Sequence, residues 1–177
     1  MNVRQYNLLP ADVSFIENLE TFTTNLRTVK PTIFAAVPRI WSVFQQKINH
    51  KLPEKFLKIL LKTPIVAKWI RHKIKQELGL NHCSNFFSGS SHLPESVFDF
   101  FKKQLHLVIQ EGYGQTENFG YATVSLLDQT KYGYVGTARL QVEIKLGAEQ
   151  EILMRSPCLM KGYYKDLQAT QAAFTAD

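Results

Sequence analysis

The chain has 177 residues, of which 45% are hydrophobic and 20% charged, the proportions of a soluble globular protein with one core or of part of a larger domain. The two cysteines, Cys83 and Cys158, lie far apart, so they indicate neither a disulfide framework nor a zinc site, and a cytoplasmic location is expected. The N-terminus lacks the apolar core of a signal peptide, and no apolar run approaches the roughly 20 residues that cross a bilayer, which excludes an integral membrane protein.

The positive charge of the chain is concentrated in one segment. The formal net charge is +6, yet residues Lys47 to Lys75 carry nine lysines or arginines against one acidic residue, Glu54. These cations are not interleaved with an aromatic platform or a recognised nucleic-acid motif, so one basic patch is expected and no nucleic-acid partner.

The first half of the chain predicts helices around one buried strand. Residues 1–13 have no periodic signal and are expected to form a flexible N-terminus, followed by a helix from Ser14 to Arg27 that starts with a Ser14/Glu17 capping box. The apolar run Thr32–Val37 lies between two prolines, which is typical of a strand in a parallel sheet. Pro38 then opens a second helix, whose inner face is Ile40, Trp41, Phe44 and Ile48.

Residues 51–78 form a helical stretch that Pro64 interrupts. Apolar stripes alternate there with lysines, a basic amphipathic pattern. Two interpretations stay open: the solvated side of helices packed on their own core, or peripheral contact of residues 51–76 with a membrane surface or a partner.

The middle of the chain predicts repeated βαβ units. Strands are expected at Cys83–Phe87 and Leu105–Ile109, with a helix at Glu95–Gln104 between them. The loops Ser88–His92 and Gly112–Glu117 would then leave the carboxyl ends of neighbouring strands and face one crevice.

Beyond residue 130 the pattern changes to short alternating stretches. Gln141–Leu146 and Glu151–Arg155 predict antiparallel strands that begin a small β-barrel, and Asp166 is expected to cap a last helix through Phe174. The predicted fold class is therefore α/β, with an α/β part at residues 14–130 and a β-rich part at residues 131–177.

The stretch Gln110–Asn118 carries the clearest chemical signal. Gly112 and Gly114 permit close backbone approach, Tyr113 offers a flat ring, Thr116 a hydroxyl, and Glu117 a carboxylate of the kind Mg²⁺ prefers. These groups suit an aromatic base, a phosphate and a metal, the parts of bound ATP. The alternative is a tight turn whose tyrosine packs and whose glutamate is solvated.

Four segments, in order, resemble the adenylate-forming AMP-binding enzymes, and within them the long-chain fatty acyl-CoA synthetases. The resemblance covers the chain from about Ser14 onward. The segments are Val29–Thr32 continuing to Val37–Trp41, Ser88–Pro94, Glu111–Glu117, and Gly162–Lys165 with Thr170 and Phe174.

This resemblance implies a two-step reaction and a role for each motif residue. A fatty carboxylate attacks the α-phosphate of Mg·ATP to give an acyl-adenylate, and coenzyme A then displaces AMP. Tyr113 would stack on adenine beside the backbone of Ser90 and Ser91, and the turn from Gly112 would bind the nucleotide. Thr116 would hydrogen-bond the α-phosphate, Glu117 would hold Mg²⁺, and Gly114 would lie beside the acyl carboxylate. The acyl site would be lined by Phe34–Trp41 and Tyr121–Val124.

The sequence also departs from the family pattern. Ser90, Ser91 and His92 replace the usual glycine, alanine and proline, and the phosphate loop with its lysine, the ribose-binding aspartate and the domain of the catalytic lysine do not occur in these 177 residues. We therefore expect the middle of a fatty acid–CoA ligase that does not complete the reaction unaided, or a non-catalytic remnant that binds nucleotide or membranes. The shared motif also occurs in enzymes that activate acetate, aryl acids or amino acids.

Overall fold

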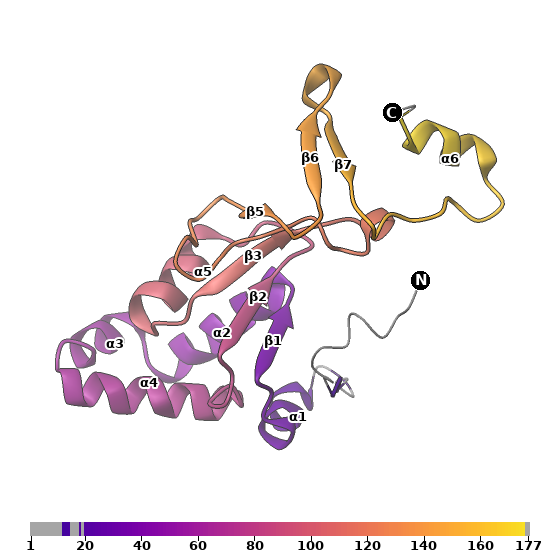
Figure 1. The fold of residues 1–177 in the computed structure, drawn as a ribbon. Coiled ribbons are helices and arrows are strands. Elements are labelled where there is room, and N and C mark those ends of the chain that lie inside the picture. The colour runs from indigo at the N-terminus through magenta and orange to yellow at the C-terminus, as the bar shows by residue number, and fades with distance from the viewer. Residues whose placement is uncertain (1–11, 15–17, 19, 176–177) are drawn as a thin grey trace.

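The fold was analysed in a computed structural model, which describes residues 12–14, 18 and 20–175 (Figure 1). The predicted α/β class is confirmed, as a mixed sheet with helices around it and a separate two-stranded hairpin. The helices are α1 (Phe22–Val29), α2 (Pro38–Lys51), α3 (Glu54–Leu60), α4 (Pro64–Leu78), α5 (Glu95–Asp99), which continues as a π-helical turn (Phe100–Gln104), and α6 (Leu167–Ala173), with short 3₁₀ turns at Thr116–Asn118 and Ala148–Gln150.

The main sheet has five strands in the order β1-β2-β3-β4-β5. The first three run parallel, as predicted, with Phe34 opposite Phe86 and Phe86 opposite Ile109, whereas β4 and β5 continue the sheet antiparallel. The strands of this sheet are β1 (Ile33–Ala36), β2 (Asn85–Ser88), β3 (Ile109–Tyr113), β4 (Thr123–Val124) and β5 (Thr137–Ala138).

Trp41 lies at the centre of the core. Its side chain is fully buried and packs edge-on against Phe34, Phe86 and Phe101, with ring centroids 5.2, 6.1 and 5.2 Å away. The indole Nε1 donates to the carbonyl of Phe87 at 3.3 Å. One helical side chain therefore joins α2 to β1, β2 and the π-helical turn.

Helix α2 begins at Pro38, as predicted, directly after β1. The next stretch divides into α3 and α4, and α4 has Pro64 in its first turn, so the predicted interruption is confirmed. Gly79 ends α4 at φ +76°, and a Cβ there would lie 2.6 Å from the backbone of Leu26, which only glycine tolerates.

The first predicted helix is wrong at its start. Helix α1 begins at Phe22, and Ser14 and Asn18 are not helical. The Asn18 carboxamide oxygen instead accepts from the backbone N–H groups of Glu20 and Thr21, which makes a turn before the helix. Glu17 of the predicted capping box and most of the predicted N-terminus, residues 1–11, lie outside the described residues.

The predicted strand Leu105–Ile109 is also wrong. Strand β3 begins only at Ile109 and continues to Tyr113, so Gly112 and Tyr113 lie in the strand and not in the turn after it. The N–H of Leu107 donates to the carbonyl of Phe101 at 2.9 Å, and His106 has φ +54°. The apolar run is therefore buried as the end of the preceding helical turn.

The hairpin of β6 (Glu143–Leu146) and β7 (Ile152–Arg155) is antiparallel, as predicted, and stands away from the main sheet in Figure 1. No closed barrel forms among the described residues. The side chain of Asp166 caps α6 by accepting from the N–H of Ala169 at 2.9 Å. Within the same part of the chain, no helix has the length and apolarity needed to cross a bilayer.

Candidate functional site

A cavity of about 580 Å³ lies at the carboxyl ends of β1, β2 and β3. The polypeptide segments that meet there are the ones for which a shared crevice was predicted, the loop after β2 and the end of β3. The lining residues are Ala35, Ala36, Val37, Phe87, Ser88, Gly89, Ser90, Gln110, Gly112, Tyr113, Gly114, Gly120, Tyr121, Thr123, Val124 and Arg139.

The cavity brings together Ser90, Gly112, Tyr113 and Gly114 among the predicted site residues. The parallel pairing explains this, because Ser88 at the end of β2 lies opposite Glu111 of β3. Ser91, Thr116 and Glu117 are not among the lining residues, and the roles of all seven residues stay predictions.

Buried polar atoms in the cavity wall lack protein partners. The hydroxyls of Ser88 and Thr123 and the amide oxygen of Gln110 have no hydrogen-bond partner among the described residues, whereas the Gln110 amide nitrogen donates to the carbonyl of Ser125 at 2.6 Å. Buried polar groups are rarely left unpaired in native proteins. This cavity is therefore suited to a polar ligand.

Ser88 and Gln110 lie in segments that the sequence analysis singled out, but it gave them no role, and it did not single out Arg139. Arg139 follows β5, and its N–H donates to the carbonyl of Ala122 at 2.9 Å. Its guanidinium lies 5.3 Å from the centre of the Tyr121 ring, so a cation faces the cavity. The pairing of β4 with β5 places Arg139 beside the cavity, and no local sequence motif indicates this position.

Gly114 makes the turn after β3 compact. A Cβ on Gly114 would lie 2.3 Å from the backbone carbon of Gly120, closer than any real Cβ contact. The chain returns here because the N–H of Gly120 donates to the carbonyl of Gln115 at 2.8 Å. The glycine is therefore required by the backbone fold of the turn.

The 3₁₀ turn Thr116–Asn118 is held at both ends. The Asn118 side-chain oxygen accepts from the N–H of Gln115 at 2.8 Å, and the two residues form a capping box. Asn118 is buried and also contacts the Met154 sulfur at 3.2 Å. Thr116 and Glu117 thus project from a fixed turn.

Glu117 accepts a hydrogen bond from the Tyr163 hydroxyl at 2.8 Å. This bond lowers the pKa of Glu117 and raises the pKa of Tyr163, because it favours the ionised carboxylate and the neutral phenol. The carbonyl of Glu117 also accepts from the N–H of Met160 at 2.7 Å. The segment before α6 is therefore tied to the turn at two points.

The chemistry of this turn fits a magnesium ion held together with phosphates. No group of three or more histidine, cysteine or acidic residues that could hold a metal occurs in the described part of the chain. Mg²⁺ usually takes only one or two protein carboxylates and obtains its other ligands from water and substrate phosphates. Glu117, whose pKa is lowered by Tyr163, supplies one ionised carboxylate of that kind.

His92, in the loop after β2, contacts two side chains. Its Nε2 lies 2.9 Å from the Tyr132 hydroxyl, and its Nδ1 lies 3.9 Å from the buried carboxylate of Glu111. The same carboxylate oxygen accepts from the N–H of Leu93 at 3.0 Å. These contacts fix the loop after β2 against β3.

The comparisons with known proteins agree with this architecture. The family model described as "AMP-binding enzyme" matches residues 8–164. Long-chain-fatty-acid–CoA ligase 6 of Rattus norvegicus is 26% identical over 92% of this chain and 27% of its own length. Long-chain-fatty-acid–CoA ligase ACSBG2, also of Rattus norvegicus, is 34% identical over 59% of this chain and 19% of its own length.

Solved structures share the fold. The A domain of carboxylic acid reductase from Segniliparus rugosus, in complex with AMP and a co-purified carboxylic acid, superimposes with a TM-score of 0.63 at 20% identity, over 89% of this chain and 25% of that one. The chain spans no more than about a third of the length of the curated relatives it matches.

We predict that Gly114→Ala destabilises the protein by about 3 kcal/mol, the upper end of the usual cost of overpacking, because the backbone at Gly120 must move. Gly133→Ala is the matched control, since Gly133 has φ +77° with nothing near its Cβ position. Gly133→Ala should lower the free energy of unfolding by only about 1 kcal/mol, because alanine is disfavoured in the left-handed backbone conformation. Urea unfolding measures both, and equal losses would contradict the close approach.

We predict that Tyr163→Phe lowers stability in a pH-dependent manner. The pKa of Glu117 is lowered in the folded protein, so the stabilisation is complete above the ordinary glutamate pKa and is lost as the pH falls through the lowered value. Urea unfolding from about pH 7 to about pH 3 should show the wild-type and Tyr163→Phe curves converging in acid. The control Tyr164→Phe, whose ring is exposed, should follow the wild type throughout.

Proposed function

Because the chain belongs to the AMP-binding enzyme family, we propose that it supplies the nucleotide-binding crevice of a long-chain fatty acid–CoA ligase. The observation that carries the proposal is the convergence of Ser90, Gly112, Tyr113 and Gly114 on one cavity beside the Thr116–Asn118 turn. The ligase names of the relatives support the choice of reaction.

The proposed reaction joins a fatty carboxylate to the α-phosphate of ATP, releases pyrophosphate, and then transfers the acyl group to the coenzyme A thiol with loss of AMP. Tyr113 stacks on adenine and the backbone at Ser90 and Ser91 borders the base. Thr116 donates to the α-phosphate. Such a reaction depends on positioning and charge neutralisation more than on a protein nucleophile.

Glu117 is the proposed magnesium ligand. When bound, Mg²⁺ neutralises charge on the phosphates of ATP. Tyr163 orients the carboxylate through one oxygen, which leaves the second oxygen for the metal. Phe119 and Tyr121 follow the turn, and the N–H of Tyr121 donates to the carbonyl of Asn118 at 3.1 Å, so the turn also fixes the cavity wall.

The acyl chain is proposed to enter beside Ala35, Ala36 and Val37, opposite Tyr121 and Val124, because these apolar side chains line the same cavity. A long-chain fatty acid is the proposed substrate over acetate, an aryl acid or an amino acid, on the strength of the relatives' names. We also propose the division of the chain into an α/β part up to residue 130 and a β-rich part beyond it.

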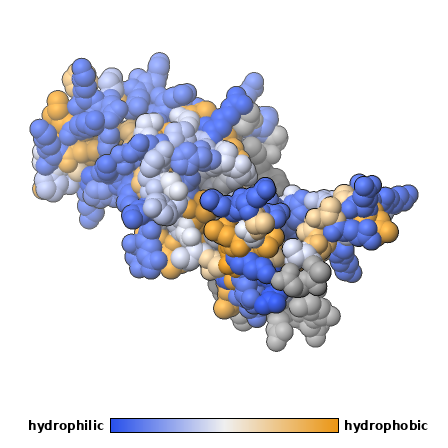
Figure 2. Space-filling model, turned by 90° about the horizontal axis from the view of Figure 1, so that it is seen from above, coloured by the Kyte–Doolittle hydropathy of each residue, from blue (hydrophilic) through white to orange (hydrophobic). Residues whose placement is uncertain are grey.

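We further propose that residues 51–76 contact an anionic membrane surface. Exposed apolar side chains lie on α3 and α4 at Phe56, Ile59, Ile65 and Trp69, with Ile65 83% exposed. Figure 2 shows apolar surface among hydrophilic surface at the end of the molecule that holds these helices. Lysines 55, 58, 62 and 68 alternate with them, the composition of helices that lie in a membrane interface.

We predict that calorimetry detects binding of ATP to this chain and that Tyr113→Ala weakens it about tenfold, since base–aromatic stacking is worth about 1–3 kcal/mol per base. Tyr164→Ala is the matched control, because Tyr164 is exposed and does not line the cavity. Glu117→Gln should remove the gain in affinity that Mg²⁺ gives and leave metal-free ATP binding unchanged. Full affinity in Tyr113→Ala would contradict the adenine site.

We predict that the protein sediments with vesicles that contain phosphatidylserine and not with neutral vesicles, and that added salt releases it. Phe56→Ser with Ile65→Ser should reduce the bound fraction several-fold, because two apolar anchors are lost. Leu126→Ser with Leu127→Ser is the control, since these exposed side chains lie outside α3 and α4. Binding that salt leaves unchanged would contradict the electrostatic contact.

A further inference from the structure

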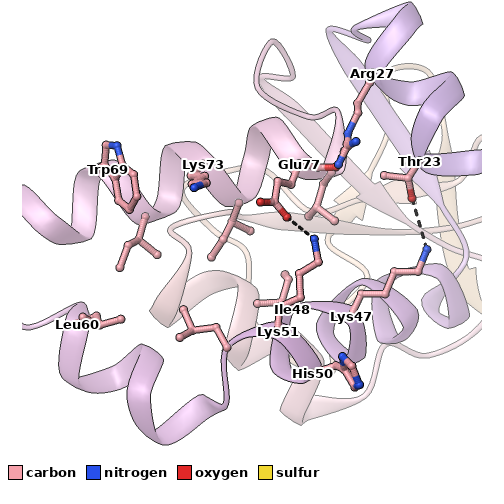
Figure 3. Close-up of a pocket in the computed structure, with 14 residues that line it drawn as sticks. Thr23, Arg27, Lys47, Ile48, His50, Lys51, Leu60, Trp69, Lys73 and Glu77 are labelled. Carbon is pink, nitrogen blue, oxygen red and sulfur yellow. Dashed lines mark hydrogen bonds and ion pairs between the residues drawn. The ribbon is translucent and has the colours of Figure 1, made fainter.

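A second cavity, of about 680 Å³, lies between α1, α2, α3 and α4 (Figure 3). It is as large as common small-molecule sites, which span about 300–1,000 Å³. The groove, as we name this cavity, is lined by Thr23, Arg27, Lys47, Ile48, His50, Lys51, Leu52, Leu60, Trp69, Ile70, Lys73, Ile74, Glu77 and Leu78.

The groove is separate from the nucleotide crevice. None of its lining residues lines the crevice. Helix α2 starts at Pro38, where β1 ends, and therefore carries Ile48 and Lys51 back towards the edge where β1 begins. Leu78 lies at the end of α4, close before β2, at that same edge. The two cavities thus occupy opposite ends of the parallel strands.

The floor of the groove is apolar. Ile48, Ile70 and Leu78 are buried, and Leu52 and Ile74 pack against the same core. Leu60 and Trp69 lie together at one end of the groove in Figure 3. Trp69 is 62% exposed, and the Lys73 Nζ lies 5.0 Å from the centre of its ring, so a large and mostly open apolar ring borders the opening.

The other end of the groove is cationic. Arg27, Lys47 and Lys51 gather there with Thr23, and Lys73 lies along the wall between the two ends in Figure 3. Four cationic side chains thus face a single carboxylate, Glu77, which Lys51 pairs at 2.8 Å.

Lys47 in particular has no anionic partner among the described residues. Its Nζ lies 3.5 Å from the neutral Thr23 hydroxyl. The Arg27 Nε donates to the carbonyl of Glu77 at 2.8 Å, and this bond holds the Arg27 guanidinium at the cationic end of the groove. The excess of positive charge is therefore concentrated at one end of an apolar groove.

From this polarity we infer that the groove binds a single-chain fatty acid anion, with the carboxylate at Arg27, Lys47 and Lys51 and the hydrocarbon chain running towards Leu60 and Trp69. An apolar groove with one cationic end is complementary to a molecule with one long apolar tail and one anionic head. The site is independent of the ATP crevice and of the proposed acyl position within it.

Trp69 provides a direct measurement. The chain has two tryptophans, and the other, Trp41, is fully buried in the core. Laurate, titrated below its micelle concentration, should shift the Trp69 emission to shorter wavelength. Affinity should rise roughly fourfold for each methylene from decanoate to laurate, the gain expected from burying a CH₂ group. Trp69→Phe should abolish the signal, and calorimetry should still record binding.

The head group is tested with matched charges. Lys47→Met with Lys51→Met removes two charges and keeps the apolar stems, and we expect laurate to bind at least about tenfold more weakly. The control Lys62→Met with Lys68→Met removes the same charge from the turn between α3 and α4 and from α4, outside the groove, and should leave laurate affinity unchanged. Lys47→Met alone leaves the Lys51–Glu77 pair intact and should show a smaller loss in the same direction.

Other occupants of the groove would give different results. Dodecyltrimethylammonium has the same tail with a cationic head, and an affinity equal to that of laurate would overturn the proposal. So would laurate binding that the two groove lysines do not affect, or that Tyr113→Ala in the crevice abolishes. A Trp69 shift caused only by vesicles, or only by self-association seen in sedimentation velocity, would assign the groove to a membrane or to a second copy of the chain.

Discussion

The structure depends on the packing of one buried indole. Trp41 extends from the first turn of α2 into a space bounded by aromatic rings of β1, β2 and the π-helical turn, and its Nε1 donates to the Phe87 carbonyl. This contact fixes the direction of α2 over the sheet. Pro38 is thereby held at the crevice end and Lys51 at the groove end, so the positions of both cavities follow from the same interaction.

The crevice owes its shape to backbone geometry more than to side-chain packing. Gly114 allows the chain to pass Gly120 in contact, and Gln115 and Asn118 cap the turn between them, so the turn has little freedom to rearrange around a ligand. The polar atoms of the cavity wall are different, because the hydroxyls of Ser88 and Thr123 have no hydrogen-bond partner in the part of the chain that the structure describes. A rigid frame with unpaired donors and acceptors is preorganised for a polar ligand, since binding needs little further ordering.

Local signals in the sequence predicted most of the fold. Pro38, Pro64 and Gly79 mark helix ends because proline and glycine restrict or release backbone angles whatever the tertiary contacts. The strand β3 was misplaced because its apolar neighbours Leu105 and Leu107 are buried without pairing, whereas Gln110 and Glu111 are polar yet lie inside the sheet. The predicted parallel strands placed Ser90, Gly112, Tyr113 and Gly114 at one edge of the sheet. Arg139 reaches the same cavity through the pairing of β4 with β5, and such non-local pairing has no sequence motif.

The sequence predicted that the lysines and arginines of residues 47–75 form one basic patch. In the structure they lie on two different surfaces. Lys47, Lys51 and Lys73 line a groove with a buried apolar floor, whereas Lys62 and Lys68 are exposed near Ile65 on the outer surface. A groove between helices admits a narrow hydrocarbon chain, whereas an exposed apolar face is covered by an extended surface. The two proposed modes of lipid recognition, one of a single molecule and one of an interface, therefore differ in geometry and not in composition.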